Sequence, residues 1–331
     1  MKRKLSLLLV LVLLVGALAA CGAKTEAPQN QNEAPKTESF TWPKNIEVIV
    51  PASAGGDTDF NARTLAKYFE KATRVKMIIT NMTGGGGTIA TSHVKEARND
   101  GSIMLYAHVG QVLVNQVAGL ADYGYEDFEI AAIPGVDKST VFVVSAKSGI
   151  TSVAELAEAS KKKPIVYGSE LGGYTHLQGL ILGNETGTDL KVVDVGPAAE
   201  KITNLLGGRI DLMSIAYGAV QDYVKTGEMV IIGQVSAERN PLLGDIPTIA
   251  EQGYDFAMDK PYIAAFPKGT DAKLVEEVAK VIKDIGNDPE YAKELENTYK
   301  QPVTIYTTKD AIELLGKTLA EYMEYADLLK K

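Results

Sequence analysis

The sequence predicts an α/β protein with two lobes, each built from a mainly parallel sheet with flanking helices. From Ile46 onward, short apolar runs alternate with segments whose apolar residues recur at helical spacing, a pattern typical of sheets covered by helices. The chain has 331 residues, of which 45% are hydrophobic. That length is sufficient for two domains that each bury a core of their own.

The expected strands are short apolar runs bounded by glycine, proline or polar residues. They cover residues 46–50, 75–79, 103–107, 141–145, 165–167, 192–195, 211–215, 229–235 and 262–266. The expected helices lie between them: Ala62, Leu65 and Phe69 share one face of a helix, and Ser152 with Glu155 forms a capping box that opens another. Further helices are expected to end at residues 207–208, 227 and 286, and a last one to begin at about residue 310.

The division into lobes follows from two similar units that lie far apart in the chain. The strands at 141–145 and 262–266 are each followed by a short glycine-containing segment and a helix. We interpret them as the places where the chain leaves the first lobe and returns to it. The expected lobes are residues 44–140 with 263–331, and residues 141–262.

The first residues are typical of a targeting signal. Lys2, Arg3 and Lys4 precede an apolar run at residues 5–15 that is too short to span a bilayer comfortably. Small residues then lead to Cys21, the one cysteine of the chain, as in the lipobox of bacterial lipoproteins. We predict a signal peptide at residues 1–20, then a lipidated Cys21 and a flexible tether over residues 21–43. An ordinary cleaved signal with a chance cysteine is the alternative.

This leader places the mature protein outside the cytoplasmic membrane, where no ATP or NAD(P)H is supplied, so we expect no cofactor. The formal net charge is −8, and it becomes −11 when the three cations of the leader are removed. An acidic chain argues against nucleic-acid binding, which needs a basic face. A single cysteine excludes a disulfide framework, and three histidines leave little material for a metal site.

Three glycine-rich segments, residues 51–59, 81–88 and 168–176, follow expected strands. Each is a strand–loop–helix turn, which places backbone N–H groups and the positive end of a helix at the carboxyl edge of a sheet. Because glycine lets a ligand approach the main chain closely, we interpret the loops together as an anion-binding site. No cationic cluster accompanies them in the sequence, so we expect the backbone to hold the anion. The alternative is that the glycines only form tight turns.

No arrangement of residues predicts catalysis. Asp57 or Thr58 is expected to cap a helix, and Asp59 would then lie in its first turn. Ser169 lacks the flanking glycines of a nucleophile elbow. His108 ends a strand and His176 begins a helix, so both are candidates to face a cleft. We therefore predict that the protein is not an enzyme.

A series of short motifs resembles those of the Bug family, the solute-binding proteins of tripartite tricarboxylate transporters. The resemblance is carried by residues 51–63 (PASAGGDTDFNAR), 81–88 (NMTGGGGT), 99–101 (NDG), 168–177 (GSELGGYTHL), 206–211 (LGGRID) and 245–253 (DIPTIAEQG). In this order and spacing, the motifs extend over essentially the whole chain after the tether.

The resemblance implies a two-lobed periplasmic-binding-protein fold, type II-like and of the Venus-flytrap kind, that closes on a small carboxylate. It also implies that backbone N–H groups and ordered water from both lobes hold one carboxylate. Carried onto this chain, the substrate-binding residues are Ala54, Gly55, Gly56, Asp59, Ser169, Gly172, Gly173 and His176, to which we add Gly86 and His108.

The chain departs from the family pattern at residues 193–196, where Val-Asp-Val-Gly replaces a segment that commonly contains Tyr and Lys. If Asp194 faces the pocket, it disfavours a second carboxylate on the ligand. If it faces solvent, di- and tricarboxylates stay possible. The segment at 107–110 departs as well, so the identity of the substrate does not carry over.

We predict a lipid-anchored, monomeric receptor that binds a small organic carboxylate of the di- or tricarboxylate class and delivers it to an integral-membrane permease. Two alternatives stay open. One is a receptor for an amino acid or another small anion. The other is a sensor or hydrolase ectodomain on the same fold, which an acid–base–nucleophile triad in the cleft would favour.

Replacing Cys21 with alanine removes the thiol that lipidation requires. The Cys21→Ala variant is expected to leave the membrane fraction, or to stay unprocessed. Membrane fractionation with mass spectrometry of the mature N-terminus measures this. A wild-type protein that is soluble and unacylated would contradict the anchor.

Overall fold

The computed structural model describes residues 40–329. The predicted signal peptide, Cys21 and the tether up to residue 39 lie outside the described residues. Thr41 and the residues after it form one compact unit. Within residues 40–329, no helix combines the length and the hydrophobicity that a membrane span requires.

Two sheets organise the described residues. The first has seven strands in the order β12-β4-β11-β3-β1-β2, with β5 paired to β11, and the second has five in the order β10-β6-β9-β7-β8. The strands of the first sheet are β1 Asn45–Val50, β2 Lys76–Asn81, β3 Ile103–His108, β4 Phe128–Ile133, β5 Val136–Asp137, β11 Lys260–Pro267 and β12 Tyr306–Thr307. Those of the second are β6 Thr140–Ser145, β7 Ile165–Ser169, β8 Leu190–Asp194, β9 Leu212–Ala216 and β10 Met229–Gln234.

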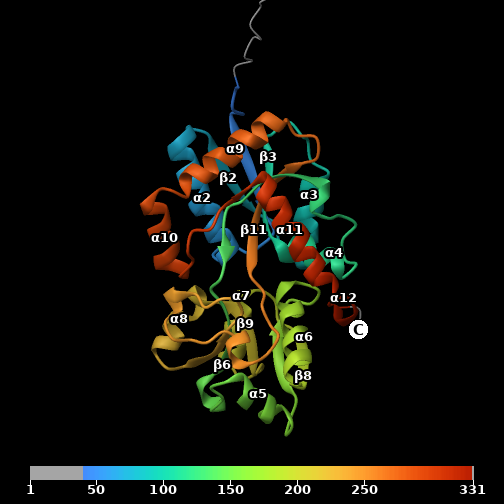
Figure 1. Ribbon diagram of the computed structural model, residues 1–331, viewed down its shortest axis with the longest axis vertical. Helices are drawn as coiled ribbons and strands as arrows, with labels where there is room; N and C mark the ends of the chain where they lie inside the picture. Colours follow the sequence, from blue (N-terminus) through green and yellow to red (C-terminus); the bar gives the residue numbers. More distant parts are fainter. Residues whose placement is uncertain (1–39, 330–331) are drawn as a thin grey trace, which may run out of the picture. The chain divides into compact units, whose positions relative to one another are not determined.

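Helices accompany both sheets, and Figure 1 shows α2, α9, α10 and α11 beside the first sheet and α5 to α8 beside the second. We call each sheet with its helices the first and the second lobe. The helices of the first lobe are α2 Asp57–Thr73, α3 Thr88–Lys95, α4 Asn115–Val117, α9 Ala272–Ile285, α10 Pro289–Tyr299, α11 Thr308–Met323 and α12 Ala326–Leu329. Those of the second are α5 Val153–Ser160, α6 Tyr174–Thr186, α7 Ala198–Leu206 and α8 Tyr217–Lys225.

The α/β class with flanking helices is confirmed, but the expectation of mainly parallel sheets is wrong. The pairs β1–β2, β1–β3, β7–β8 and β7–β9 are parallel, whereas β4, β6, β10, β11 and β12 pair antiparallel. The reason lies in the crossovers. The parallel strands of each lobe end toward the other lobe, so β6 and β11, which arrive from there, enter the sheet at the carboxyl edge and run against them. Accordingly, Thr140 at the start of β6 pairs with Ala216 at the end of β9. β4 and β10 run in the same direction as the parallel strands and pair antiparallel because β11 and β6 are their neighbours.

Every expected strand has a counterpart, but β4, β5 and β12 were not expected. β5 and β12 have two residues each, too few for a periodic signal. The segment FEIAAI of β4 is apolar and buried at nearly every position, and this signal was available in the sequence. Of the expected helix signals, the N-cap at Ser152 is confirmed, because Ser152 Oγ accepts a hydrogen bond from Glu155 N at 3.2 Å. The other half of the expected capping box differs, because the Glu155 carboxylate accepts from Thr151 N at 2.7 Å.

Strand β6 shows how the second lobe is held together. Phe142 and Val144 belong to a large buried cluster that extends through both lobes. Val141 and Val143 belong to a smaller cluster on the opposite face of the sheet. Because successive side chains of a strand point to opposite faces, this continuous apolar run is buried on both sides, as expected for a sheet with helices on each face.

The two lobes are joined by crossovers that pair with each other. β5 leads into β6, and the long segment after β10 leads into β11. Asp137 pairs with Lys260 and Val136 with Pro261 in an antiparallel bridge at this junction. The lobe limits given above, 44–140 with 263–331 and 141–262, stay a prediction.

Candidate functional site

The glycine-rich loops lie at the ends of parallel strands in both lobes. In the first lobe, one loop joins β1 to α2 and a second joins β2 to α3 through a 3-10 turn at Gly85–Gly87. In the second lobe, a loop joins β7 to α6. These ends are the edges at which the crossovers enter the sheets, so the loops of one lobe face those of the other.

Three of the predicted site residues lie next to the opposite lobe. A Cβ atom at Gly86 would lie 4.0 Å from the carbonyl oxygen of Leu171, and one at Gly172 would overlap Leu120. The His108 ring packs edge-on against Tyr174, with 5.6 Å between the ring centroids. The structure therefore brings the second glycine loop, the end of β3 and the start of α6 together.

The Asp59 side chain fixes the conformation of the first loop, which joins β1 to α2. Its carboxylate, nearly fully buried, accepts hydrogen bonds from Gly55 N at 2.9 Å, Arg63 Nε at 2.9 Å and Asn81 Nδ2 at 2.9 Å. Burial raises the pKa of Asp59, but the bonds to Arg63, Gly55 and Asn81 outweigh it and leave the pKa below its ordinary value. Gly56 N donates to Ser53 O at 3.3 Å. The direct role of these residues in binding stays a prediction.

Ala54 and Gly55 lie on the exposed rim of the first loop. Gly55 and Asp59 also line an open hollow of about 460 Å³ between α2 and α10. From α10, Tyr299 Oη donates to Gly55 O at 3.2 Å. The shape of the first loop therefore depends on a helix that lies some 240 residues later in the chain.

The second-lobe loop has a similar internal network. Gly172 N donates to His176 Nδ1 at 3.0 Å, and Gly173 N donates to Glu170 O at 3.1 Å. Burial lowers the pKa of His176, an effect that Asp194 partly offsets. Ser169 is different, because its hydroxyl is fully buried and has no hydrogen-bond partner among the described residues.

Free amides also lie at the starts of the helices that follow these loops. Among residues 40–329, no acceptor is found for the N–H groups of Asp57 and Thr58 in α2, or of Tyr174 and Thr175 in α6. First-turn amides have no partner within their own helix, and they carry the positive end of the helix dipole. Each lobe thus offers, next to a glycine loop, a helix N-terminus with unused donors.

Asp57 does not cap α2 as we expected. The N-cap is Gly56, which has no side chain to bond, and the Asp57 carboxylate turns instead toward the crossovers. There it forms an ion pair with Lys260 and accepts a hydrogen bond from Tyr262 Oη at 2.8 Å. Lys260 also pairs with Asp137 at 2.9 Å. The Lys260 ammonium stabilises the Asp57 carboxylate better than a single backbone amide would, because a charge-assisted hydrogen bond is stronger than a neutral one. Only the tertiary structure brings Lys260 to this position.

These charges set the protonation of their neighbours. Burial raises the pKa of Asp57, but the Lys260 ammonium outweighs it and holds the pKa well below the ordinary value of 3.8. Burial lowers the pKa of Lys260, and Asp137 with Asp57 reverse this to a net increase. Burial and the repulsion from Lys260 lower the pKa of His108 to about 3. His108 is therefore neutral at physiological pH, and its Nδ1 accepts a hydrogen bond from Gly110 N at 2.9 Å.

A second buried cation, Lys201 of α7, was missed in the sequence. Only 4% of the residue is exposed, and its Nζ donates to Thr175 Oγ1 at 3.0 Å. Burial lowers its pKa, and the charges of Asp57 and Lys260 of the first lobe also act on it. A buried cation thus lies beside the second-lobe loop, although the sequence shows no cationic cluster there. In the sequence, Lys201 directly precedes the apolar Ile202, and this position does not indicate a buried cation.

Asp194, at the end of β8, is exposed to solvent. Its Oδ1 accepts a hydrogen bond from Gly196 N at 3.3 Å. It is nevertheless close enough to act electrostatically on His176 and Lys201. Asp194 is therefore a solvent-exposed carboxylate near the second-lobe loop.

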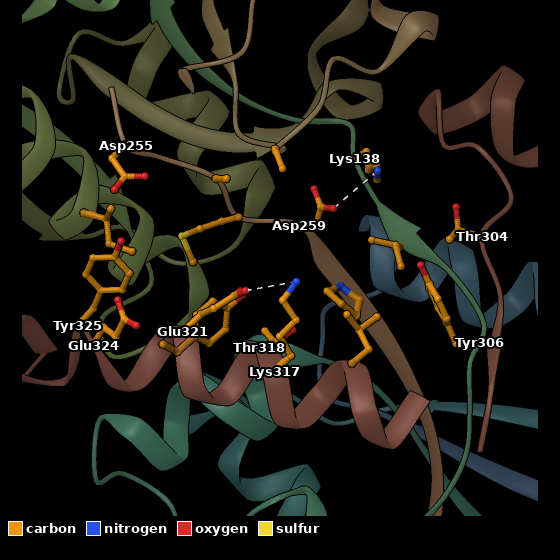
Figure 2. A pocket seen from close by; sticks show the side chains of 18 residues that line it. Lys138, Asp255, Asp259, Thr304, Tyr306, Lys317, Thr318, Glu321, Glu324 and Tyr325 are labelled. Carbon is orange, nitrogen blue, oxygen red and sulfur yellow. Dashed lines mark ion pairs between the residues drawn. The ribbon is translucent and has the colours of Figure 1, made fainter. Parts of the chain in front are cut away.

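A separate cavity of about 430 Å³ lies against the crossovers and α11. Figure 2 shows its acidic and basic side chains. They include two long ion pairs, Lys138–Asp259 at 3.8 Å and Lys317–Glu321 at 3.9 Å. None of the predicted site residues lines it. Among the described residues, no three His, Cys, Asp or Glu side chains gather as metal ligands.

Residues 61–322, more than half of the chain, match the family described as "Tripartite tricarboxylate transporter family receptor". The chain belongs to this family. The resemblance to the Bug family is thereby confirmed, and the protein is a solute-binding receptor rather than an enzyme. Receptors of this family work outside the cytoplasm.

Individual relatives agree with the assignment. BugT of Bordetella pertussis is 27% identical over 243 residues, which are 71% of this chain and 74% of BugT. The solved structure of the periplasmic binding protein BugD is 26% identical, with a TM-score of 0.73 over 87% of this chain and 98% of that chain. The structure of Rpa4515 from R. palustris with adipate is 23% identical, with a TM-score of 0.78 over 87% of this chain and 98% of that chain. The two-lobed fold is confirmed by these structures.

Replacing Lys260 with methionine leaves the carboxylates of Asp57 and Asp137 buried without their cation. The Lys260→Met variant is expected to lose about 3–5 kcal/mol of unfolding free energy at pH 7. Urea unfolding measures this, with the exposed Lys268→Met as a control that changes the free energy by less than about 1 kcal/mol.

The pH dependence of the same variant has a defined sign. In the wild type, the pKa of Asp57 is lower in the folded state than in the unfolded state, where it is 3.8. The ion pair therefore stabilises the fold above pH 3.8, and this stabilisation is lost as the pH falls below that value. In Lys260→Met, protonation relieves the repulsion between the carboxylates, so its deficit should shrink between pH 7 and pH 4. A deficit that is constant over this range would contradict the ion-pair explanation.

Proposed function

We propose that this receptor captures a small organic carboxylate, of the di- or tricarboxylate class, between its two lobes. The observation that carries the proposal is the pair of helix N-termini with unused amides, α2 in the first lobe and α6 in the second. Carboxylates bind well at such ends because N–H donors and the helix dipole act together. Lys201 adds positive charge beside the N-terminus of α6.

The residues around these ends are the proposed binding site. Ser169 offers a buried hydroxyl that has no hydrogen-bond partner within residues 40–329. His108 is neutral, so the local positive field comes from Lys201 and the amides. The loops formed by Ala54, Gly55, Gly56, Gly86, Gly172 and Gly173 shape the space, and Asp59 and His176 hold those loops in place. The R. palustris neighbour with adipate supports a ligand of this kind.

We infer the setting of the receptor from the leader and the family. Lipidation at Cys21 would hold the protein on the outer side of the cytoplasmic membrane, and the tether would let it reach an integral-membrane permease. The family described as a transporter receptor supports delivery to such a permease. We propose that the receptor acts as a monomer.

An amino acid is the second candidate ligand. Exposed Asp194 lies near the second-lobe loop, where it acts on His176, and a carboxylate in that place would pair with an amino group. This arrangement would fit a ligand that has one carboxylate and one cation.

A thermal-shift panel of mono-, di- and tricarboxylates, amino acids and neutral sugars separates these ligands. A ligand at 100 times its dissociation constant is expected to stabilise the protein by about 2.7 kcal/mol. Stabilisation by di- or tricarboxylates supports the proposal. Stabilisation by amino acids alone supports the second candidate, and stabilisation only by cations or sugars would rule out an anion receptor.

Replacing Gly56 with valine tests the first loop. At position 56 the φ angle is −78°, and an added Cβ would meet only Ser53 O at 3.5 Å, so the fold should tolerate valine. The branched side chain would stand beside the free amides of α2, and we expect affinity for the carboxylate found in the panel to fall at least about tenfold, or about 1.4 kcal/mol. Calorimetry measures this, and a melting curve checks folding. Unchanged affinity in the folded variant would mean that the loop is only a turn.

A further inference from the structure

Lys201 is a buried cation without an anion of its own. Its one hydrogen bond goes to the neutral Thr175 hydroxyl at 3.0 Å, and that hydroxyl also accepts from Glu170 N at 3.3 Å. No carboxylate among the described residues forms an ion pair with it. A buried charge of this kind is unfavourable unless an opposite charge compensates it.

The charged groups around Lys201 come from several elements. Glu170 follows β7, Asp194 ends β8, and Asp57 and Lys260 belong to the first lobe. Of these, Asp57 is already paired with Lys260, and Asp194 is exposed. Glu170 is half-buried and raises the pKa of Lys201 more than any other charge does, but it makes no ion pair within the described residues. None of them neutralises the ammonium directly.

Lys260 provides the comparison. It is also buried, at 6% exposure, but it is held by Asp57 and by Asp137 at 2.9 Å. Its charge is therefore satisfied within the protein. Of the two buried lysines at the lobe junction, Lys201 is the one with charge left for a ligand.

The place of Lys201 fits a ligand contact. Thr175, which holds its ammonium, lies in the first turn of α6 and has a free backbone amide. Lys201 thus adds a full positive charge to the helix N-terminus of the second lobe. The N-terminus of α2 supplies a separate set of free amides in the first lobe.

We propose that Lys201 is a specificity-determining residue that pairs with one carboxylate of the ligand, while the N-terminus of α2 receives another. The ligand is then a dicarboxylate or larger, because a monocarboxylate has one anionic group and satisfies one lobe only. This inference rests on the proposed function and narrows its substrate class. Thr175 is the positioning residue that directs the ammonium of Lys201.

The test compares acids of equal length with one or two carboxylates. Succinate is paired with butanoate, and adipate with hexanoate, and calorimetry measures their affinities for the wild type and for Lys201→Met. Lys191→Met is the matched control, since Lys191 is an exposed lysine on the adjacent β8 of the same lobe. Thr175→Val is a second variant, which keeps the size of the side chain but removes the hydroxyl.

The wild type is expected to bind a dicarboxylate at least about tenfold more tightly than its monocarboxylate partner. Lys201→Met should lose that advantage and leave monocarboxylate affinity within about twofold, and Thr175→Val should lose part of it. Lys191→Met should change neither affinity. Without ligand, Lys201→Met should melt at a higher temperature than the wild type, because the substitution removes an uncompensated buried charge.

Three results would overturn the inference, and they separate it from the proposed function. Equal dicarboxylate affinity in the wild type and Lys201→Met would refute the role of Lys201 and leave carboxylate capture standing. A Lys201→Met protein that melts lower without ligand would show that Lys201 serves the fold. A wild type that binds none of the four acids, nor any other carboxylate of the panel, would refute both proposals.

Discussion

The ion pair of Lys260 with Asp57 and Asp137 is the contact on which the arrangement of the lobes depends. Lys260 begins β11, Asp137 ends β5, and Asp57 opens α2, so one ammonium joins both crossovers to the helix that follows the first glycine loop. Asp137 also accepts hydrogen bonds from the backbone and hydroxyl of Ser139, at 2.6 Å each, just before β6. Hinge motion in two-lobed proteins is absorbed by a few connecting residues, and here those residues are fixed to the first loop by charge.

The same cluster defines the electrostatics between the lobes. The ammonium of Lys260 is balanced inside the protein, and its repulsion together with burial keeps His108 neutral. Lys201 has no such balance. Although the chain is acidic, with a net charge of −8, charges beyond about 8–10 Å are screened at physiological salt. We therefore expect Lys201 and the helix ends, rather than the net charge, to decide which ligand is attracted.

Several elements were predictable because their signals are local. Each strand that the alternation of apolar runs with helical periodicity predicted has a counterpart in the structure. Ser152 and Glu155 correctly predicted the start of a helix. β12 was not predictable, since two residues at Tyr306–Thr307 form a strand only through their pairing with β4. The mixture of parallel and antiparallel strand pairs was not predictable from the sequence either, because it depends on which strands become neighbours in the sheet.

The sequence by itself determined the α/β class, the glycine loops after strands and, through motifs along the whole chain, the receptor family. Each of these signals is contained in a short window of residues. Only the tertiary structure decided what the side chains at the site do. Asp57 lies 203 residues from Lys260, and Lys201 lies 26 residues from Thr175, so no periodic pattern links the partners. Whether a buried charge meets an opposite charge depends on distance in space, and burial with pairing is what separates a structural lysine from one that is free for a ligand.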